Sequence, residues 1–191
     1  MGPDQVYLHI RVVLAIVLGL AITKLLNGIA LLIERRNRWS LIHVCWVLWA
    51  LVSVVTLWWW EFGLSELPAW TFFSYIFVIS YCSLYFVLSA LIFPEDASMN
   101  GGYDDYLIER RYWFFGLIAV ITLMDLIDTS LKGTERWEAL GIAYPIKTAV
   151  MLVIAGLGMV LVNKKAHLVL VLVALVYLTG YYTIEYFNVI A

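Results

Sequence analysis

Six stretches of this 191-residue chain are nearly continuous runs of apolar residues, each about as long as a bilayer is thick. A helix needs about 20 consecutive apolar residues to cross a hydrocarbon core of ~30 Å. The predicted spans cover residues 12–33, 40–60, 70–93, 113–131, 139–161 and 167–188. Hydrophobic residues make up 64% of the chain and charged residues only 14%, which is far from the balance of a soluble domain. We therefore predict an all-α polytopic membrane protein, in which residues 1–191 form a single bundle of about six transmembrane helices.

The links between the spans are short, with one exception, and short links favour antiparallel neighbours. The long link runs from Pro94 to Tyr112, and its Pro-Glu-Asp start and Asn-Gly-Gly turn predict an exposed loop. This loop separates two halves of three spans each. Because three is odd, a repeat of the halves would have inverted topology, an arrangement common in transporters and channels. Sequence identity between the halves is poor, so a true repeat and an accidental division into threes both stay open.

Lysine and arginine residues in the links predict the orientation of the bundle. The first, third and fifth links carry Arg35, Arg36, Arg38, Arg110, Arg111, Lys164 and Lys165, and the opposite side carries Arg11, Lys132 and Arg136. The positive-inside rule then places the odd-numbered links in the cytoplasm and both termini outside. The chain has the general look of small six-span bacterial inner-membrane proteins, a resemblance that implies no activity. We expect it in a bacterial cytoplasmic (inner) membrane.

Four charged residues lie well inside the predicted spans: Lys24 in the first, Asp125 and Asp128 in the fourth, and Lys147 in the fifth. A central charge costs roughly 2.5 to 3.5 kcal/mol on insertion scales, so such residues are candidates for a functional site. At a rise of ~1.5 Å per residue, Asp125 and Lys147 lie at equal depth on consecutive antiparallel helices. We therefore predict a buried ion pair between them.

Residues beside these charges extend the group of candidates. Asp128 shares a helix face with Asp125 and is level with Tyr144, which could donate a hydrogen bond to it. Asn27 shares a face of the first span with Lys24 in the same way. We therefore add Tyr144 and Asn27 to the residues that could line a path through the bundle.

Four more candidates lie along the second, fifth and sixth spans. Pro145, inside the fifth span, would leave the carbonyl of Gly141 without its helical donor, and such broken backbone at membrane depth needs protein or a water-filled cavity to satisfy it. Glu61 and Glu185 could ring the outer half of the same cluster, although their positions are more typical of wet interfacial carboxylates. His43 lies nearer the cytoplasmic end of its span, where a lone histidine is more often packed, or at headgroup level, than a proton carrier.

The leading interpretation is a small transporter or channel that moves protons or a small ion or solute between the helices. Asp125 and Asp128 would titrate or coordinate, while Lys147 and Lys24 would tune them. The alternative is a non-catalytic sensor, accessory subunit or assembly factor whose buried charges are structural. The acidic third link would then offer a docking surface. The sequence leaves both interpretations open.

Other classes of function lack their sequence signatures. No Gly-x-Ser-x-Gly serine, His-Glu-x-x-His zinc site or Gly-rich phosphate loop occurs, so the sequence favours the absence of enzyme activity while leaving it open. Cys45 and Cys82 are isolated thiols in apolar spans, and no two histidines have metal-ligand spacing, so we expect neither metal nor cofactor. The net charge of −2 and the lack of a long basic stretch predict no nucleic-acid binding. The expected partners are the lipid bilayer, a small ion or solute, and a second copy of the chain in a homo-oligomer.

Overall fold

The computed structural model describes residues 3–34, 40–67, 69–93 and 102–190, and every regular element among them is a helix. These elements are α1 (Pro3–Glu34), α2 (Leu41–Trp60), the short 3-10 helix η1 (Glu61–Glu66), α3 (Phe72–Ile92), α4 (Gly102–Glu109), α5 (Arg111–Leu131), α6 (Thr134–Leu140), α7 (Ala143–Val160) and α8 (Lys164–Ile190). Six helices among the described residues are long and apolar enough to cross a membrane: α1, α2 with the start of η1, α3, α5, α7 and α8. The predicted all-α bundle of six spans is therefore confirmed.

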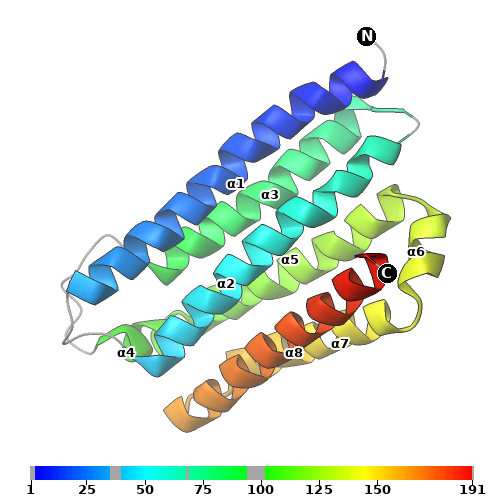
Figure 1. Ribbon diagram of the computed structural model, residues 1–191. Coiled ribbons are helices and arrows are strands. Elements are labelled where there is room, and N and C mark those ends of the chain that lie inside the picture. Colours follow the sequence, from blue (N-terminus) through cyan, green and yellow to red (C-terminus); the bar gives the residue numbers. More distant parts are fainter. Residues whose placement is uncertain (1–2, 35–39, 68, 94–101, 191) are drawn as a thin grey trace.

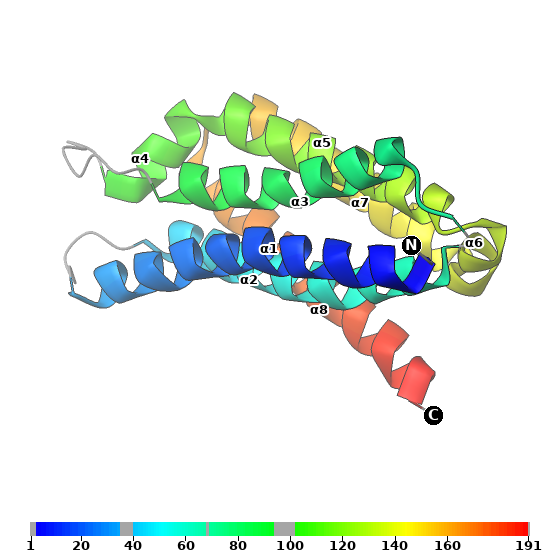
Figure 2. The same cartoon turned by 90° about the horizontal axis from the view of Figure 1, so that it is seen from above.

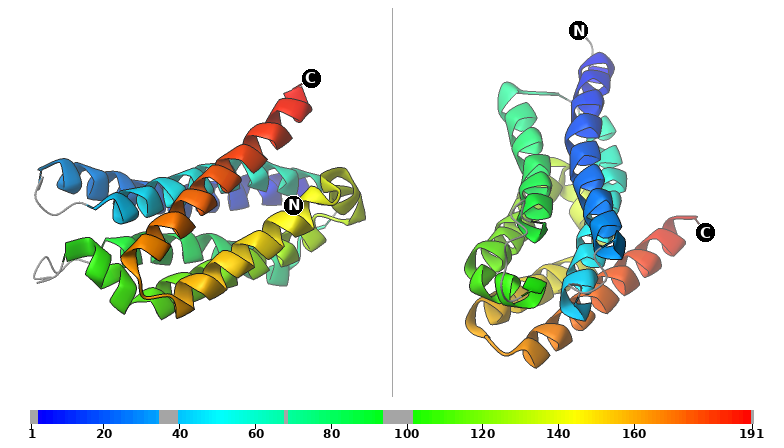
Figure 3. Two further views of the ribbon diagram at one scale, coloured as in Figure 1. Left: turned by 90° about the horizontal axis from the view of Figure 1, so that it is seen from below. Right: turned by 90° about the vertical axis from the view of Figure 1, so that its left-hand side faces the viewer.

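The six long helices run back and forth, so the short elements gather at the two ends of the bundle (Figure 1). We call one end, which carries α6 and the N-terminus, the α6 end, and the other, which carries α4, the α4 end. The helix α8 packs against α2 and α7, and toward its C-terminus it leans away from the other helices (Figure 2, Figure 3). The helices η1 and α6 thus lie at the α6 end, whereas α4 and the link between α7 and α8 lie at the α4 end (Figure 1).

The two halves of the chain pack differently. The helix α1 packs mainly against α3, whereas the corresponding helix of the second half, α5, packs mainly against α7. A further contact, between α3 and α5, joins the halves, and α2 packs against α8. Because corresponding helices have different neighbours, the packing gives no support to an inverted repeat.

Two predictions from the sequence need correction: the residue at which the first helix begins, and the loop predicted between the third and fourth spans. The helix α1 begins at Pro3 rather than at residue 12, because proline is favoured in the first turn of a helix and polar residues can continue a helix beyond the apolar run. The link predicted as an exposed loop contains α4, whose Leu107 is buried and whose Tyr103 ring stacks on His43 at 4.2 Å between centroids. Contacts with α2 therefore stabilise a helix in a segment whose composition predicts a turn.

The fifth predicted span is shorter than expected, and this changes the role of Pro145. Gly141 has a φ of +55°, a conformation that favours glycine and ends α6. The helix α7 therefore begins at Ala143, and Pro145 lies in its first turn. The first four N–H groups of a helix have no intrahelical acceptor, so a proline there removes no bond. The prediction that Pro145 breaks a helix at membrane depth is wrong.

Close packing of α5 on α7 depends on Gly158. A methyl group added at this glycine would overlap the buried ring of Phe115 on α5, whereas one added at Gly156, two residues away on α7, would meet no atom within 4 Å. We expect Gly158→Val to destabilise the protein by about 1 to 3 kcal/mol through overpacking. Thermal melting of the purified protein in detergent checks this, with Gly156→Val as the matched control. Equal melting temperatures for the two variants would contradict the expectation.

Candidate functional site

Three carboxylates and two lysines are buried together toward the α6 end of the bundle. Glu61 begins η1, Asp125 and Asp128 lie on α5, Lys132 caps the end of α5, and Lys147 lies on α7. All five side chains are buried, and Asp128 is 0% exposed. We call these five residues the charge cluster.

The ion pair predicted between Asp125 and Lys147 is confirmed. The ammonium group of Lys147 donates to Oδ2 of Asp125 at 2.8 Å. The hydroxyl of Tyr144 donates to the same oxygen at 2.9 Å, and the hydroxyl of Tyr81 donates to Oδ1 at 3.4 Å. Both oxygens of Asp125 therefore have donors, and this half of the cluster is electrically balanced.

The sequence predicted a hydrogen bond from Tyr144 to Asp128, but the Tyr144 hydroxyl donates to Asp125 instead. Tyr144 lies three residues before Lys147 on α7, so both side chains lie on the same helix face and reach the same carboxylate. The hydroxyl of Thr129 donates to the Tyr144 hydroxyl at 2.7 Å and holds it in place. Register between α5 and α7 thus joins Tyr144 to the Asp125–Lys147 pair.

Aromatic rings surround the ammonium group of Lys147. The distances from its Nζ to the ring centroids are 4.6 Å for Tyr144, 5.5 Å for Tyr181, 5.7 Å for Trp60 and 5.9 Å for Tyr182. Ring faces attract a cation electrostatically, more strongly where water is excluded. Together with Asp125, these rings favour the charged form of Lys147.

Lys132 connects the other two carboxylates. Its Nζ lies 2.5 Å from Oδ2 of Asp128 and 3.4 Å from Oε2 of Glu61, and it donates to the carbonyl of Trp60 at 3.3 Å. Burial acts to lower the pKa of Lys132, but the charges of Glu61 and Asp128 outweigh it and raise the pKa above its ordinary value. The two carboxylates therefore favour the charged form of Lys132.

The sequence treated Lys132 as a cation of the outer link and Glu61 as more typical of a wet interface. Lys132 does follow the last residue of α5, so its place in that link is as expected, but its side chain is buried in the charge cluster. The expectation of a wet interface is wrong for Glu61, which directly follows the last residue of α2, has a side chain only 5% exposed and lies 3.4 Å from Nζ of Lys132. The orientation itself stays a prediction.

Several buried polar atoms in this region have no hydrogen-bond partner. The acceptors are Oδ1 of Asp128 and the two carboxylate oxygens of Glu61, of which Oε2 still lies 3.4 Å from Nζ of Lys132. The donors are Nε1 of Trp60, the hydroxyl of Tyr181 and Nε of Arg136, whose guanidinium lies 4.3 Å above the Trp60 ring. Buried polar atoms in folded proteins are nearly always hydrogen-bonded, so each exception calls for an explanation. Two buried carboxylates with free oxygens around one lysine form a site that can accept a proton.

Two hollows adjoin the charge cluster. A cavity of about 40 Å³, enough for a water molecule, is lined by Asp125 and Lys147 and by polar groups of Ser53 and Thr122. A second pocket, of about 180 Å³, lies between α1 and the end of α2 with the start of η1, and Glu61 is among its lining residues. The cluster therefore extends from this pocket to a polar cavity inside the bundle.

The comparisons with known proteins find no match. The chain matches no protein family model, no curated protein and no solved structure. Any functional conclusion therefore rests on the chemistry of the site itself.

The two candidates on α1 lie away from the charge cluster. Lys24 is half-buried and Asn27 is exposed, both in the half of α1 nearer the α4 end. The helix packs mainly against α3 and α2 rather than against α5 or α7. The sequence placed Lys24 near the centre of its span, but α1 starts earlier than predicted, so the centre of the helix lies closer to its N-terminus.

The remaining candidates also lie outside the charge cluster. His43 is buried at the α4 end, with its Nε2 at 3.0 Å from the carbonyl oxygen of Ile92, which agrees with the packed histidine that the sequence favoured. Glu185 is half-buried near the end of α8. Within the described part of the chain, no group of three or more His, Cys, Asp or Glu side chains could hold a metal ion.

The sequence missed Lys132, Thr129, Tyr81 and the aromatic rings around Lys147 as members of the site. One signal for Lys132 was available, because it follows Asp128 by four residues and such pairs meet on a helix face. The contributions of Tyr81 from α3 and of Trp60 from α2 depend on helices that are distant in sequence.

Proposed function

We propose that this protein is a small membrane transporter that moves protons, alone or coupled to a small ion or solute, and that Glu61 and Asp128 share the transported proton. The observation that carries the proposal is the charge balance of the buried cluster. Three carboxylates face two lysines, and the carboxylate oxygens without hydrogen bonds all belong to Glu61 and Asp128.

The balance of charge favours one proton on this pair of carboxylates. Asp125 and Lys147 neutralise each other, which leaves Glu61 and Asp128 to share Lys132. A net charge buried away from water is costly, and an added proton removes it. The same proton supplies one donor to a group of carboxylate oxygens that lack hydrogen bonds.

Other groups face this pair of carboxylates without replacing the proton. Arg136 reaches the region from α6, but its guanidinium stacks on Trp60 and forms no ion pair with the cluster among the described residues. From α3, the buried thiol of Cys82 also faces Glu61 and Asp128. Neither group bonds to the free carboxylate oxygens, so the proton remains the simplest way to satisfy them.

The arrangement supports a path that is open at one side only. A proton could enter at Glu61 from the pocket beside α1, pass to Asp128, and reach the polar cavity at Asp125. Closer to the α4 end, the core contains Trp46, Phe114, Phe115 and Ile118, all at most 1% exposed. Transport would therefore need a second packing of the helices, as in alternating access.

The same closed core is the specific observation that favours the alternative, a sensor or accessory subunit. A proton bound between Glu61 and Asp128 would change how the C-terminal end of α2 sits on α5 without any proton crossing the bundle. Proton binding is common to both interpretations, and only flux separates them.

Flux through reconstituted protein tests the proposal. In proteoliposomes with a pH-sensitive dye inside, we expect Glu61→Gln and Asp128→Asn each to lower the proton flux at least about tenfold, which is ~1.4 kcal/mol of barrier. The matched control is Asp105→Asn, which removes a carboxylate that pairs with Lys164 on the exposed surface at the α4 end. Wild-type flux in both variants, with monodisperse protein, would refute the proposal. Proton uptake without any wild-type flux would favour the sensor.

A further inference from the structure

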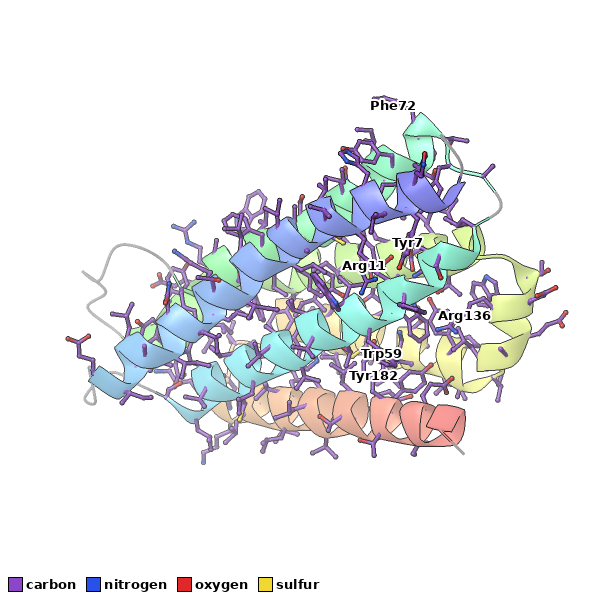
Figure 4. All side chains as sticks on the ribbon, turned by 45° about the horizontal axis from the view of Figure 1, so that its top comes forward. Tyr7, Arg11, Trp59, Phe72, Arg136 and Tyr182 are labelled. Atoms are coloured by element: carbon purple, nitrogen blue, oxygen red, sulfur yellow. The ribbon has the colours of Figure 1, made fainter. Side chains whose placement is uncertain are left out.

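The pocket beside Glu61 combines two opposite charges with an aromatic wall. It has a volume of about 180 Å³ and is lined by Tyr7, Arg11, Leu14, Leu18, Trp58, Trp59, Glu61 and Phe62. Tyr7 and Arg11 point from α1 toward α2 (Figure 4). Trp59 and Phe62 are each 62% exposed, so the pocket opens through the outer surface of the bundle.

The lining changes from polar to apolar along α1. Arg11 lies near the α6 end, and Leu14 and Leu18 follow at about 5 and 10 Å deeper into the span, from ~1.5 Å of rise per residue. Across from them, Glu61 is 5% exposed; neither carboxylate oxygen has a hydrogen bond, and Oε2 lies 3.4 Å from Nζ of Lys132, which leaves Oε1 without any partner. A charged outer part and an aliphatic inner part match an amphiphile that lies parallel to the helices.

We infer that this pocket binds the headgroup of a zwitterionic phospholipid, with its ammonium group at Glu61 and its phosphate at Arg11. The rings of Trp58, Trp59 and Phe62 would surround the ammonium group, since ring faces attract cations. Arginine is well suited to phosphate, because its planar guanidinium can donate two parallel hydrogen bonds. The acyl chains would continue into the bilayer past Leu14 and Leu18.

Charge complementarity distinguishes this occupant from two others. An anionic lipid would satisfy Arg11 but would place negative charge beside the free oxygens of Glu61. A purely cationic amphiphile would satisfy Glu61 but would lie next to Arg11. The volume is also below the 300 to 1,000 Å³, roughly, of sites for drug-sized molecules, which fits a headgroup whose chains stay in the membrane.

This inference does not require the proposed proton transport. The headgroup needs only a free oxygen of Glu61 as acceptor, and the shared proton can then reside on Asp128. Lipid retention without proton flux would support this site and contradict the proposed function. Proton flux without lipid retention would support the proposed function and contradict this site.

Native mass spectrometry of the intact protein released from nanodiscs tests the inference. The nanodiscs contain equal amounts of phosphatidylethanolamine, phosphatidylcholine and phosphatidylglycerol of different chain mass. We expect one retained lipid per chain, with the two zwitterionic lipids favoured over phosphatidylglycerol at least about fivefold. Arg11→Gln, Glu61→Gln and Phe62→Ala should each lower this retention about tenfold.

Control variants separate the site from general lipid contact. Glu135→Gln on α6 removes an exposed carboxylate at the same end of the bundle and should leave the retained lipid unchanged. Phe62 lies outside the charge cluster, so its variant stays informative if Glu61→Gln fails to fold. Equal retention of all three lipids, or full retention in Phe62→Ala and Arg11→Gln, would overturn the inference. Displacement of the lipid by millimolar soluble phosphoethanolamine would show a site for a soluble zwitterion instead.

Discussion

Replacing Lys147 with methionine is expected to destabilise the bundle by about 3 to 5 kcal/mol, because breaking a buried ion pair leaves the partner charge uncompensated. Asp125 would lose its closest donor, at 2.8 Å, and would keep only the hydroxyl groups of Tyr144 and Tyr81. Methionine approximates the length of the lysine stem, so the rings around the side chain retain most of their packing. The expected loss is therefore mainly electrostatic.

A double-variant cycle measures this effect. Removing both charges with Asp125→Asn and Lys147→Met should recover a large part of the stability that Lys147→Met loses, because the interaction between contacting residues is not additive. Lys164→Met is the matched control, since Lys164 forms an exposed pair with Asp105 whose side chains are 51% and 43% exposed. Exposed pairs contribute about 0 to 1 kcal/mol, so the control should melt close to wild type. A double variant that is no more stable than Lys147→Met would show that Lys147 does not stabilise the protein through its ion pair with Asp125.

The second large effect is expected at Lys132. Lys132→Met removes the cation between Glu61 and Asp128 and leaves two buried carboxylates beside each other. We expect a loss of about 3 to 5 kcal/mol, as for other buried charges that lose their partner. Thermal melting of the detergent-solubilised protein, together with the yield of monodisperse protein, measures it.

Glu61→Gln provides the sharpest contrast with Lys132→Met. This variant leaves Asp128 and Lys132 as a balanced pair, so it should cost clearly less than the loss of about 3 to 5 kcal/mol expected for Lys132→Met. It should nevertheless abolish the proton sharing that we propose for Glu61 and Asp128. Combining Glu61→Gln with Lys132→Met should be less destabilising than Lys132→Met alone. If Glu61→Gln proves as damaging as Lys132→Met, the charge balance described for the cluster is wrong.

The spans and one contact of the site could be predicted from the sequence because both follow from local properties. Run length alone identifies a helix that crosses a bilayer, and the confirmed spans are those runs. Equal depth on consecutive antiparallel helices was sufficient to pair Asp125 with Lys147, because their separation along each helix follows from a constant rise per residue.

Predictions that relied on the position of a helix end were less successful. Lys24 was placed near the middle of its span, but the early start of α1 moves it toward the α4 end and away from the charge cluster. Pro145 was placed inside a helix, whereas the turn at Gly141 puts it at a helix start. Apolar run length does not define such ends, because polar residues can extend a helix and a single glycine can end one.

The six apolar runs, then, determine by themselves that the chain spans the membrane and that Asp125 and Lys147 meet inside it. Only the tertiary structure decides which residues at the span ends join them. Glu61 and Lys132 are 71 positions apart, and their 3.4 Å contact exists because α2 and α5 end at the same end of the bundle (Figure 1). Burial at a helix end depends on what covers that end, and the covering segment comes from another part of the chain. For this reason the Asp125–Lys147 pair could be predicted from the sequence, whereas Glu61 and Lys132 join the charge cluster only through the fold.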